Sequence, residues 1–541
     1  MSRSVRLRPW QKAALERLSA SGRPDFLAVA TPGAGKTTFA LAAAVQHLVA
    51  HPEHRVIVVA PTQHLKHQWS RAAGRFDLHL EPLWSPRDGR LPDDMHGIVV
   101  TYQQVSVQAR ALRGLAADAF VIFDEIHHAG EERAWGDSVR HAFEGSARRL
   151  SLSGTPFRSD TAAIPFVDYD GLGTASADYE YGYGEALADG DVVRPVYFPR
   201  VDGQMEWVAP DGALHSHTFD DALDAARSGQ RLRTALSLSG EWLPSVLDQA
   251  HRRLMAVREL QAHAGGLVIA MDQEHARGIV ELMRRRFGVR PTLVLSDDPT
   301  ASARIEHFAE GDQPWIVAVR MVSEGVDIPR LRVGVFATNT ATELFFRQAT
   351  GRLVRWTRGL RGQKAFFFIP DDPRLRRFAA GIAEQRRHSL VRRDDERPAP
   401  EGLDELPATA PQEEQLSLFA ALSAVALGDP FEPEWLTDDP DAGLEPVERH
   451  DEGLVITLAP PPRPGASGPG SVHHRTRREH KAHLRAENAD WARDLVRVTG
   501  MSHAQVNGEL NRLAGVGSIS EATVVQLERR LAAAERWFRN L

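Results

Sequence analysis

The chain has 541 residues, a formal net charge of −7 and 42% hydrophobic residues. This length favours about three to four domains, and the absence of cysteine excludes disulfides and cysteine-ligated zinc or iron–sulfur centres. Because no apolar run approaches the roughly twenty residues of a membrane span, and the N-terminus lacks the apolar core of a signal peptide, we expect a soluble, cytoplasmic protein without a membrane partner.

The first strong pattern in chain order is a phosphate-binding loop. Residues 26–30 are an apolar run that predicts a strand, and residues 38–50 have the composition of a helix. Backbone N–H groups of a glycine-rich loop between a strand and a helix point at phosphate oxygens, while its lysine reaches the terminal phosphates and its hydroxyl ligates Mg²⁺. Ala30 replaces the usual first glycine, but strand, loop and helix all agree with the motif. The predicted nucleotide-binding residues of this loop are Thr31, Pro32, Gly33, Ala34, Gly35, Lys36, Thr37 and Thr38, of which Lys36 is also catalytic and Thr37 also a metal ligand.

Four more strand patterns follow. They cover residues 55–60, 97–101, 119–123 and 150–153. Their alternation with helical patterns predicts a parallel α/β sheet, in which ligands gather at the carboxyl ends of the strands. The third strand runs directly into Asp124 and Glu125. One carboxylate there can hold Mg²⁺ and its neighbour can orient and deprotonate an attacking water, so both are predicted to be catalytic, with Asp124 also a metal ligand.

Residues 166–260 interrupt this alternation, and they form either an accessory element or a longer connection between two domains. Tyr179, Tyr181 and Tyr183 alternate with other residues in this stretch. A period of two is more typical of a half-buried strand than of a platform that stacks on bases, so we predict a strand.

A second set of strand patterns predicts a second sheet. It covers residues 266–270, 292–295, 315–319, 333–337 and 364–369. This part has no phosphate loop of its own, so the nucleotide must lie between the two sheets. Arg352 and Arg355 are three residues apart in a helical pattern that begins at Glu343, and they should therefore share a face. Guanidinium groups there can neutralise charge that develops on a γ-phosphate, so Arg352, Arg355 and Gln348 are predicted to be catalytic.

The C-terminal third changes composition twice. Residues 393–470 contain 18 acidic and 4 basic residues and many prolines, which predicts a largely disordered acidic linker with a short helix over residues 415–427. The rest of the chain then has a positive balance that suits a polyanion. Residues 471–541 predict a small helical module, with a capping box formed by Ser502 and Gln505, that binds DNA or a protein partner.

Taken in order, seven motifs resemble those of superfamily two helicases and translocases of the DEAD/DEAH-box type, such as repair helicases and the motor subunits of type III restriction enzymes. The motifs are residues 7–11, 61–63, 100–102, 124–127, 153–156, 323–329 and 348–355. The resemblance covers roughly residues 5–370 and implies an α/β fold with two tandem RecA-like parallel-sheet domains and an insertion between motifs. Composition and periodicity add the acidic disordered linker and the all-helical C-terminal module. The resulting boundaries are 1–165 for the first RecA-like domain, 166–260 for the insertion, 261–392 for the second RecA-like domain, 393–470 for the linker and 471–541 for the module.

The same resemblance implies roles for individual residues. Gln11 would pair with adenine and so favour ATP, with an ordinary glutamine at a helix start as the alternative. Thr62, Gln63 and Thr101 would contact nucleic-acid phosphates, with simple capping as the alternative for the two threonines. The remaining implied roles are nucleotide contact for Gly325 and Asp327, and coupling of hydrolysis to domain movement for Ser153 and Thr155.

Together these patterns predict a nucleic-acid-dependent ATPase that uses ATP and Mg²⁺ and acts as a DNA helicase or a double-strand DNA translocase. Three alternatives remain: the motor part of a restriction or phage-defence nuclease complex, an RNA helicase, and a scaffold that binds DNA without hydrolysis. A nuclease needs paired carboxylates and a lysine on strands, which Asp441 and residues 479–481 imitate only remotely. DNA repair is a further cellular role that fits a motor of this kind.

Overall fold

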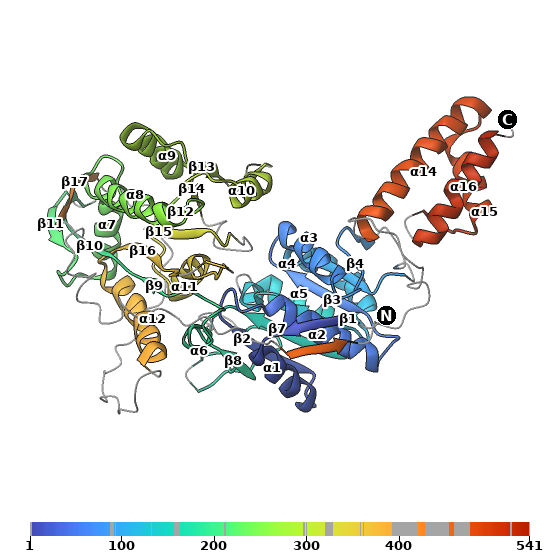
Figure 1. Cartoon of the computed structure of the whole chain (residues 1–541), viewed down its shortest axis with the longest axis horizontal. Helices are drawn as coiled ribbons and strands as arrows, with labels where there is room; N and C mark the ends of the chain where they lie inside the picture. Colours follow the sequence, from blue (N-terminus) through green and yellow to red (C-terminus); the bar gives the residue numbers. More distant parts are fainter. Residues whose placement is uncertain are drawn as a thin grey trace.

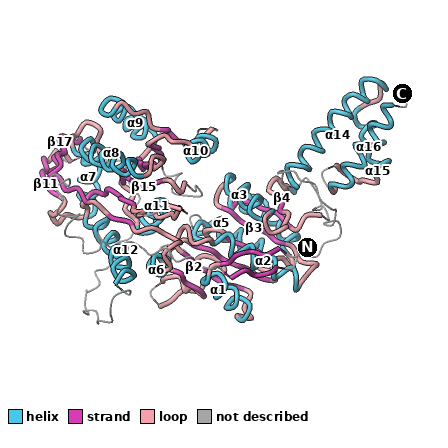
Figure 2. Tube along the Cα trace, in the orientation of Figure 1, coloured by secondary structure: helices cyan, strands magenta, loops and turns pink. Residues whose placement is uncertain are grey.

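The structure is a computed structural model. It describes residues 3–86, 91, 94–130, 133–155, 163–171, 173–209, 212–295, 298, 300–319, 328–357, 359–360, 362–391, 420–427, 454–458, 477–519 and 522–539. Two α/β lobes lie next to each other, and a group of three helices projects beside the first lobe (Figure 1). Helices and strands alternate through both lobes, whereas the projecting group is helical (Figure 2).

The first lobe is built on a parallel sheet with the strand order β4-β5-β3-β6-β7-β2-β8. Its strands are β2 (Asp25–Ala30), β3 (Val56–Ala60), β4 (Leu80–Glu81), β5 (Gly97–Thr101), β6 (Phe120–Phe123), β7 (Arg148–Ser153) and β8 (Tyr179–Tyr181). Its helices are α1 (Pro9–Ala20), α2 (Lys36–Ala50), α3 (Gln63–Gly74), α4 (Tyr102–Ala116), α5 (Arg133–Phe143) and α6 (Tyr183–Ala188), with a 3-10 turn at Ile126–Gly130. The central strands are buried along their length, as parallel strands covered on both faces must be.

The second lobe has a mixed sheet with a parallel centre, ordered β11-β10-β16-β15-β12-β14-β13, to which β9 and β17 add beside β16 and β10. Its strands are β9 (Val196–Tyr197), β10 (Arg200–Val208), β11 (Leu214–Thr218), β12 (Gly265–Ala270), β13 (Thr292–Val294), β14 (Trp315–Ala318), β15 (Leu331–Ala337), β16 (Ala365–Pro370) and β17 (Ala420–Leu427). Its helices are α7 (Ala225–Ala235), α8 (Trp242–Leu260), α9 (Gln273–Phe287), α10 (Ala301–Glu310), α11 (Glu343–Leu353) and α12 (Pro373–Val391). The predicted tandem α/β arrangement is confirmed.

The stretch predicted as an insertion is divided between the two lobes. β8 pairs with β2 in the first sheet, and β9 and β10 pair with β16 in the second. The predicted strand is confirmed for Tyr179 and Tyr181, whereas Tyr183 is the first residue of α6. Tyr181 is buried and its ring stacks on Trp10 with 5.1 Å between centroids.

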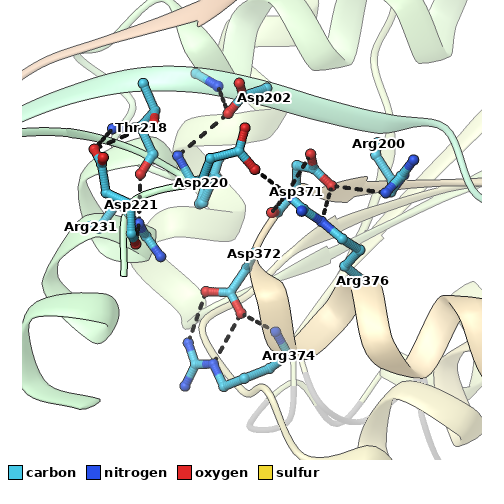
Figure 3. Close-up of polar contacts among 12 residues, drawn as sticks. Arg200, Asp202, Thr218, Asp220, Asp221, Arg231, Asp371, Asp372, Arg374 and Arg376 are labelled. Atoms are coloured by element: carbon cyan, nitrogen blue, oxygen red, sulfur yellow. Dashed lines mark hydrogen bonds and ion pairs between the residues drawn. The ribbon is translucent and has the colours of Figure 1, made fainter. Parts of the chain in front are cut away.

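Ion pairs fasten the outer strands of the second lobe to the start of α12 (Figure 3). The Asp371 carboxylate lies 2.9 Å from Arg376 and 3.6 Å from Arg200, which is the first residue of β10. Arg376 also bonds Asp220 at 2.8 Å, so it ties the loop after β11 to the end of β16. β10 and β11 are therefore an integral part of the second lobe.

The acid-rich stretch contains two strands, which corrects the prediction for part of it. β17 pairs antiparallel with β10, and β18 (Leu454–Leu458) pairs antiparallel with β1 (Arg3–Leu7). The helix predicted over residues 415–427 is wrong for residues 420–427, because the exposed edge of β10 supplies hydrogen-bond partners that a local pattern cannot reveal. Residues 392–419, 428–453 and 459–476 lie outside the described residues.

The C-terminal module consists of α14 (Arg477–Thr499), α15 (His503–Ala514) and α16 (Val524–Arg539). The predicted capping box is present: Gln505 N donates to Ser502 Oγ at 3.3 Å, and Ser502 N donates to Gln505 Oε1 at 3.0 Å. A buried ion pair of 3.1 Å between Lys481 and Asp94 fixes the module to the loop before β5. Among the described helices, none combines the length and apolarity that a membrane crossing requires.

Candidate functional site

The phosphate loop joins β2 to α2 in the conformation that its glycines permit. Gly33 and Gly35 have φ angles of +88° and +96°, which favour glycine over any residue with a side chain. A Cβ on Gly35 would lie 2.7 Å from the Gln11 amide nitrogen, so Gln11 would have to leave its position beside the loop. α2 begins at Lys36, and its first N–H groups face the loop, as an anion site at a helix N-terminus requires.

The start of α1 braces this loop from one side. Trp10 Nε1 donates to Ala34 O at 3.1 Å, and Gln11 Nε2 donates to Gly35 O at 2.9 Å. Gln11 Oε1 accepts from Arg8 N at 2.8 Å, so both ends of this amide hold the chain in place. Gln11 thus lies against the phosphate loop, while its contact with adenine stays a prediction.

Lys36 and Glu125 meet at the carboxyl edge of the first sheet. Lys36 Nζ lies 3.1 Å from Glu125 Oε1 and also donates to Ala30 O at 3.2 Å. The other carboxylate oxygen of Glu125 accepts from Gly154 N at 3.0 Å. Glu125 itself has a φ of +47°. This backbone conformation is unfavourable for residues other than glycine, and it is found more often at functional sites than elsewhere.

The two adjacent carboxyl groups have opposite electrostatic environments. Burial, together with the neighbouring Glu125 carboxylate, raises the pKa of Asp124 to about 6. Burial also acts to raise the pKa of Glu125, but the Lys36 ammonium, His127 and the Gly154 N–H outweigh it and hold that pKa below its ordinary value. Glu125 is therefore a carboxylate at neutral pH, and it is a weak base as long as Lys36 pairs with it.

Asp124 is held by two aromatic residues. Trp69 Nε1 donates to Asp124 Oδ2 at 2.8 Å, and the Tyr102 hydroxyl donates to Asp124 O at 3.0 Å. The Thr37 hydroxyl and the Asp124 carboxylate offer the oxygen ligands that Mg²⁺ prefers, so the donor chemistry of this edge fits that ion. The role of Trp69 was not predicted, because an indole 55 residues from its carboxylate carries no local motif.

Residues of the second lobe reach this edge. Gln348 Nε2 lies 3.0 Å from His127 Nε2, so the glutamine of α11 touches the end of the acidic motif. A Cβ on Gly351 would lie 2.5 Å from Pro32 Cγ, and a Cβ on Gly33 would lie 3.1 Å from Arg355 Cδ. These contacts bring the phosphate loop of the first lobe and residues 348–355 of the second lobe together. The contact between His127 and Gln348 was not predicted, because nothing local connects two residues 221 positions apart.

The predicted position of Arg355 on a helix is wrong. α11 ends at Leu353, and Arg355 forms a β-bridge with Val193. The chain that connects the lobes holds it there, because Arg194 N donates to Val354 O at 2.8 Å. The Arg194 guanidinium is fully buried and donates to Leu331 O at 3.0 Å. Arg352 therefore lies in the last turn of α11 and Arg355 in a bridge beyond it, so the two arginines do not share one helical face.

A cavity of about 130 Å³ lies at this junction. It is lined by Arg8, Gly33, Asp191, Val192, Pro329, Arg355 and Trp356. Gly33 of the phosphate loop forms one wall and Arg355 of the second lobe forms another, so the cavity lies between the two lobes.

The predicted nucleic-acid contacts stay predictions. Thr62 Oγ1 accepts from Leu65 N at 3.4 Å and Thr101 Oγ1 accepts from Gln104 N at 3.1 Å, so both threonines cap helices. Thr101 is buried whereas Gln63 is exposed. Gly325 and Asp327 lie outside the described residues.

Comparisons with known proteins agree with this geometry. Residues 4–158 match the family described as "Type III restriction enzyme, res subunit". The chain is 42% identical over 564 residues to "Uncharacterized protein MT2985" of Mycobacterium tuberculosis (strain CDC 1551 / Oshkosh), an alignment that covers 97% of this chain and 92% of the relative. The chain belongs to the same family as this mycobacterial protein.

Two more distant similarities cover a smaller share of the chain. The chain is 24% identical over 366 residues to "DNA 3'-5' translocase XPB2" of Sulfurisphaera tokodaii, covering 65% of this chain and 79% of that protein. A solved structure, "ATP-dependent Type ISP restriction-modification enzyme LlaBIII bound to DNA", aligns with a TM-score of 0.45 and 15% identity over 71% of this chain and 30% of that one. With its ordered motifs and the restriction-subunit match, this member of the family is a superfamily two helicase-like protein.

Proposed function

We propose that this protein is an ATP-dependent DNA helicase or double-strand DNA translocase that hydrolyses ATP between its two lobes. The observation that carries the proposal is the meeting of Arg355 with Gly33 in the phosphate loop, beside the Gln348–His127 contact. An arginine from one lobe placed against the phosphate loop of the other makes hydrolysis sensitive to the separation of the lobes.

The residues around the loop suit binding and hydrolysis of a nucleoside triphosphate. N–H groups of the loop and of the start of α2 would hold the phosphates, and Lys36 would turn from Glu125 to the terminal phosphate. Glu125 then loses its cationic partner, so its pKa rises and its carboxylate becomes a better base for a proton of the attacking water. Thr37 and Asp124 would hold Mg²⁺, which would neutralise phosphate charge when bound.

The second lobe would complete the site on closure. The Arg355 and Arg352 guanidinium groups would neutralise charge that develops on the transferred phosphoryl group. Gln348 would couple closure of the lobes to Asp124 and Glu125 through His127, because its amide contacts His127 across the two lobes. Hydrolysis and phosphate release would remove the phosphate that Lys36 and Arg355 contact from opposite lobes, and the lobes could then separate and shift along a nucleic-acid strand.

DNA is the proposed track, supported by the similarity to a DNA translocase and by the positive charge balance outside the acid-rich stretch. The grip would be on phosphates, which position a protein without reading sequence. Binding should therefore weaken steeply as salt concentration rises.

ATP turnover tests the proposal when it is measured with single-stranded DNA, duplex DNA, forked DNA, RNA and no nucleic acid. DNA should stimulate turnover, and Glu125→Gln should lower kcat by about 100- to 10,000-fold because it removes the general base. Arg355→Ala should lower kcat by about 1,000-fold while ATP binding persists. Turnover that ignores DNA and survives Glu125→Gln would refute the proposal.

A second candidate function is the motor part of a restriction or phage-defence nuclease complex. The match of residues 4–158 to a restriction-enzyme subunit favours it. A nuclease site needs carboxylates and a lysine, and the nearest candidates in the sequence are Asp441 and residues 479–481. The Lys481 ammonium is buried in its ion pair with Asp94, and Asp441 lies outside the described residues. A gel assay for strand scission in the presence of ATP separates the two functions, because a motor alone leaves the strands intact.

A further inference from the structure

A cluster of histidines lies at the far end of the helix that begins with Lys36. His47 and His51 are four residues apart at the end of α2, and His54 follows in the turn before β3. The three rings lie together, with centroids 4.9 Å apart for His47 and His51, 5.1 Å for His47 and His54, and 4.8 Å for His51 and His54. Glu53 adds a carboxylate to the same turn.

The ligand atoms of this turn are close enough to share one ion. Those of His51, Glu53 and His54 all lie within 4.8 Å of one another. Two atoms bound to one zinc ion are at most about 4.2 Å apart, since each bond is about 2.0–2.1 Å long. His51 and Glu53 are exposed, so small rotations of their side chains can close the remaining gap.

His47 is placed to orient His54. Its Nε2 lies 2.9 Å from His54 Nδ1, while His54 Nε2 faces the Glu53 carboxylate at 3.4 Å. If His54 donates from Nδ1, its Nε2 lone pair points to the shared position. A histidine ligand that donates its second ring N–H to a neighbour is the usual arrangement at metal sites. The Phe120 ring packs against the His47 ring, with 5.0 Å between ring centroids.

We propose that His51, Glu53 and His54 bind one divalent transition-metal ion of zinc-like chemistry, with His47 as the residue that positions His54. Two imidazoles and one carboxylate suit Zn²⁺ or Co²⁺ better than Mg²⁺ or Ca²⁺, which prefer oxygen ligands. The C-terminal end of α2 also favours a cation, because the helix dipole is negative there. The ion would join the end of α2 to the start of β3.

This site is separate from the nucleotide site. The phosphate loop follows the carboxyl end of β2, whereas the histidine turn precedes the amino end of β3 in the same parallel sheet. The two sites therefore lie at opposite edges of that sheet, and the 15 residues of α2 separate them by about 22 Å. Metal bound here can be measured without ATP turnover.

Calorimetric titration of Zn²⁺ into the untagged, chelator-treated full-length protein, with excess Mg²⁺ present and no nucleotide, tests the proposal. One Zn²⁺ per chain should bind, and Co²⁺ in its place should give visible ligand-field absorption. Because the chain has no cysteine, thiolate ligands cannot produce that signal. Zn²⁺ should also raise the thermal unfolding midpoint.

Variants separate a built site from adventitious binding. His51→Ala and Glu53→Gln change exposed side chains, so they should keep the metal-free midpoint and weaken Zn²⁺ binding at least tenfold. His47→Gln should weaken binding by about tenfold through the orientation of His54. His263→Ala, an exposed histidine of the second lobe, should bind as the unmodified protein does. Absence of saturable binding, or binding that His51→Ala leaves unchanged, would overturn the proposal.

Discussion

Asp124 and Glu125 are neighbours in the chain, yet their carboxyl groups respond to opposite influences. Burial and the second carboxylate disfavour ionisation of Asp124, and its pKa rises to about 6. Lys36 favours ionisation of Glu125. The site therefore contains one carboxylate that is stabilised by its partner and one whose charge costs folding free energy, which a bound cation would offset.

Asp124→Asn should therefore stabilise the nucleotide-free protein at neutral pH while it abolishes ATP turnover. The amide oxygen can still accept from Trp69, and removal of the buried charge should gain on the order of 1–3 kcal/mol. Because the carboxyl pKa is 3.8 when unperturbed and about 6 in the fold, the gain is complete above about pH 6 and vanishes as pH falls toward 3.8. Urea denaturation without Mg²⁺ at several pH values measures it. A gain that does not change with pH would contradict the assigned cause.

Gly351→Ala should impair closure of the lobes without harming either lobe. The new Cβ would lie 2.5 Å from Pro32 Cγ, so α11 could not approach the phosphate loop as closely. We expect kcat to fall by about 10- to 100-fold, as it does when misplacement approaches an ångström. Gly381→Ala is the matched control, because this helical glycine of α12 has no neighbour within 4 Å of an added Cβ. Equal activities of the two variants would remove Gly351 from the closure contact.

Helices and strands whose formation depends on neighbouring residues in the chain were predicted correctly from the sequence. The apolar runs located β3, β5 and β6, and the Ser502 capping box located the start of α15. Predictions from the sequence were wrong where contacts with distant chain segments decide the structure. β17 is a strand because β10 offers an edge, and Arg355 lies outside the helix because it forms a bridge with Val193. Local periodicity contains no information about such pairings.

The ion pair between Lys481 and Asp94 should decide how firmly the C-terminal module is attached. Both side chains are 2% exposed, and Asp94 Oδ2 also accepts from Val524 N at 3.3 Å. Lys481→Met leaves the aspartate buried without its cation, which should cost about 3–5 kcal/mol of attachment. Limited proteolysis should then release the module faster. Arg497→Met is the control, because its pair with Asp494 at 3.3 Å is exposed and worth at most about 1 kcal/mol. Similar release rates would show that the buried pair does not hold the module.

At the scale of the whole molecule, one segment reaches both lobes. After α12 the chain adds β17 to the second sheet, and it then pairs β18 with β1 beside the first lobe before it enters the module. Residues 428–453 connect these two strands, and a chain of that length can span up to about 90 Å. The C-terminal part of the chain is therefore attached to the second lobe through β17 and to the first lobe through β18.

Cleavage between β17 and β18 should leave the C-terminal part bound to the first lobe. β18 pairs with β1 over five residues, from Arg3 with Leu458 to Leu7 with Leu454, and Lys481 adds its buried contact with Asp94. A protease site inserted within residues 428–453 and cut in the folded protein should thus give two fragments that co-elute in gel filtration. The same cut in Lys481→Met should let the smaller fragment separate, because a single pair of five-residue strands is marginally stable on its own. If the fragments of the unmodified chain separate at once, neither contact holds the C-terminal part to the first lobe.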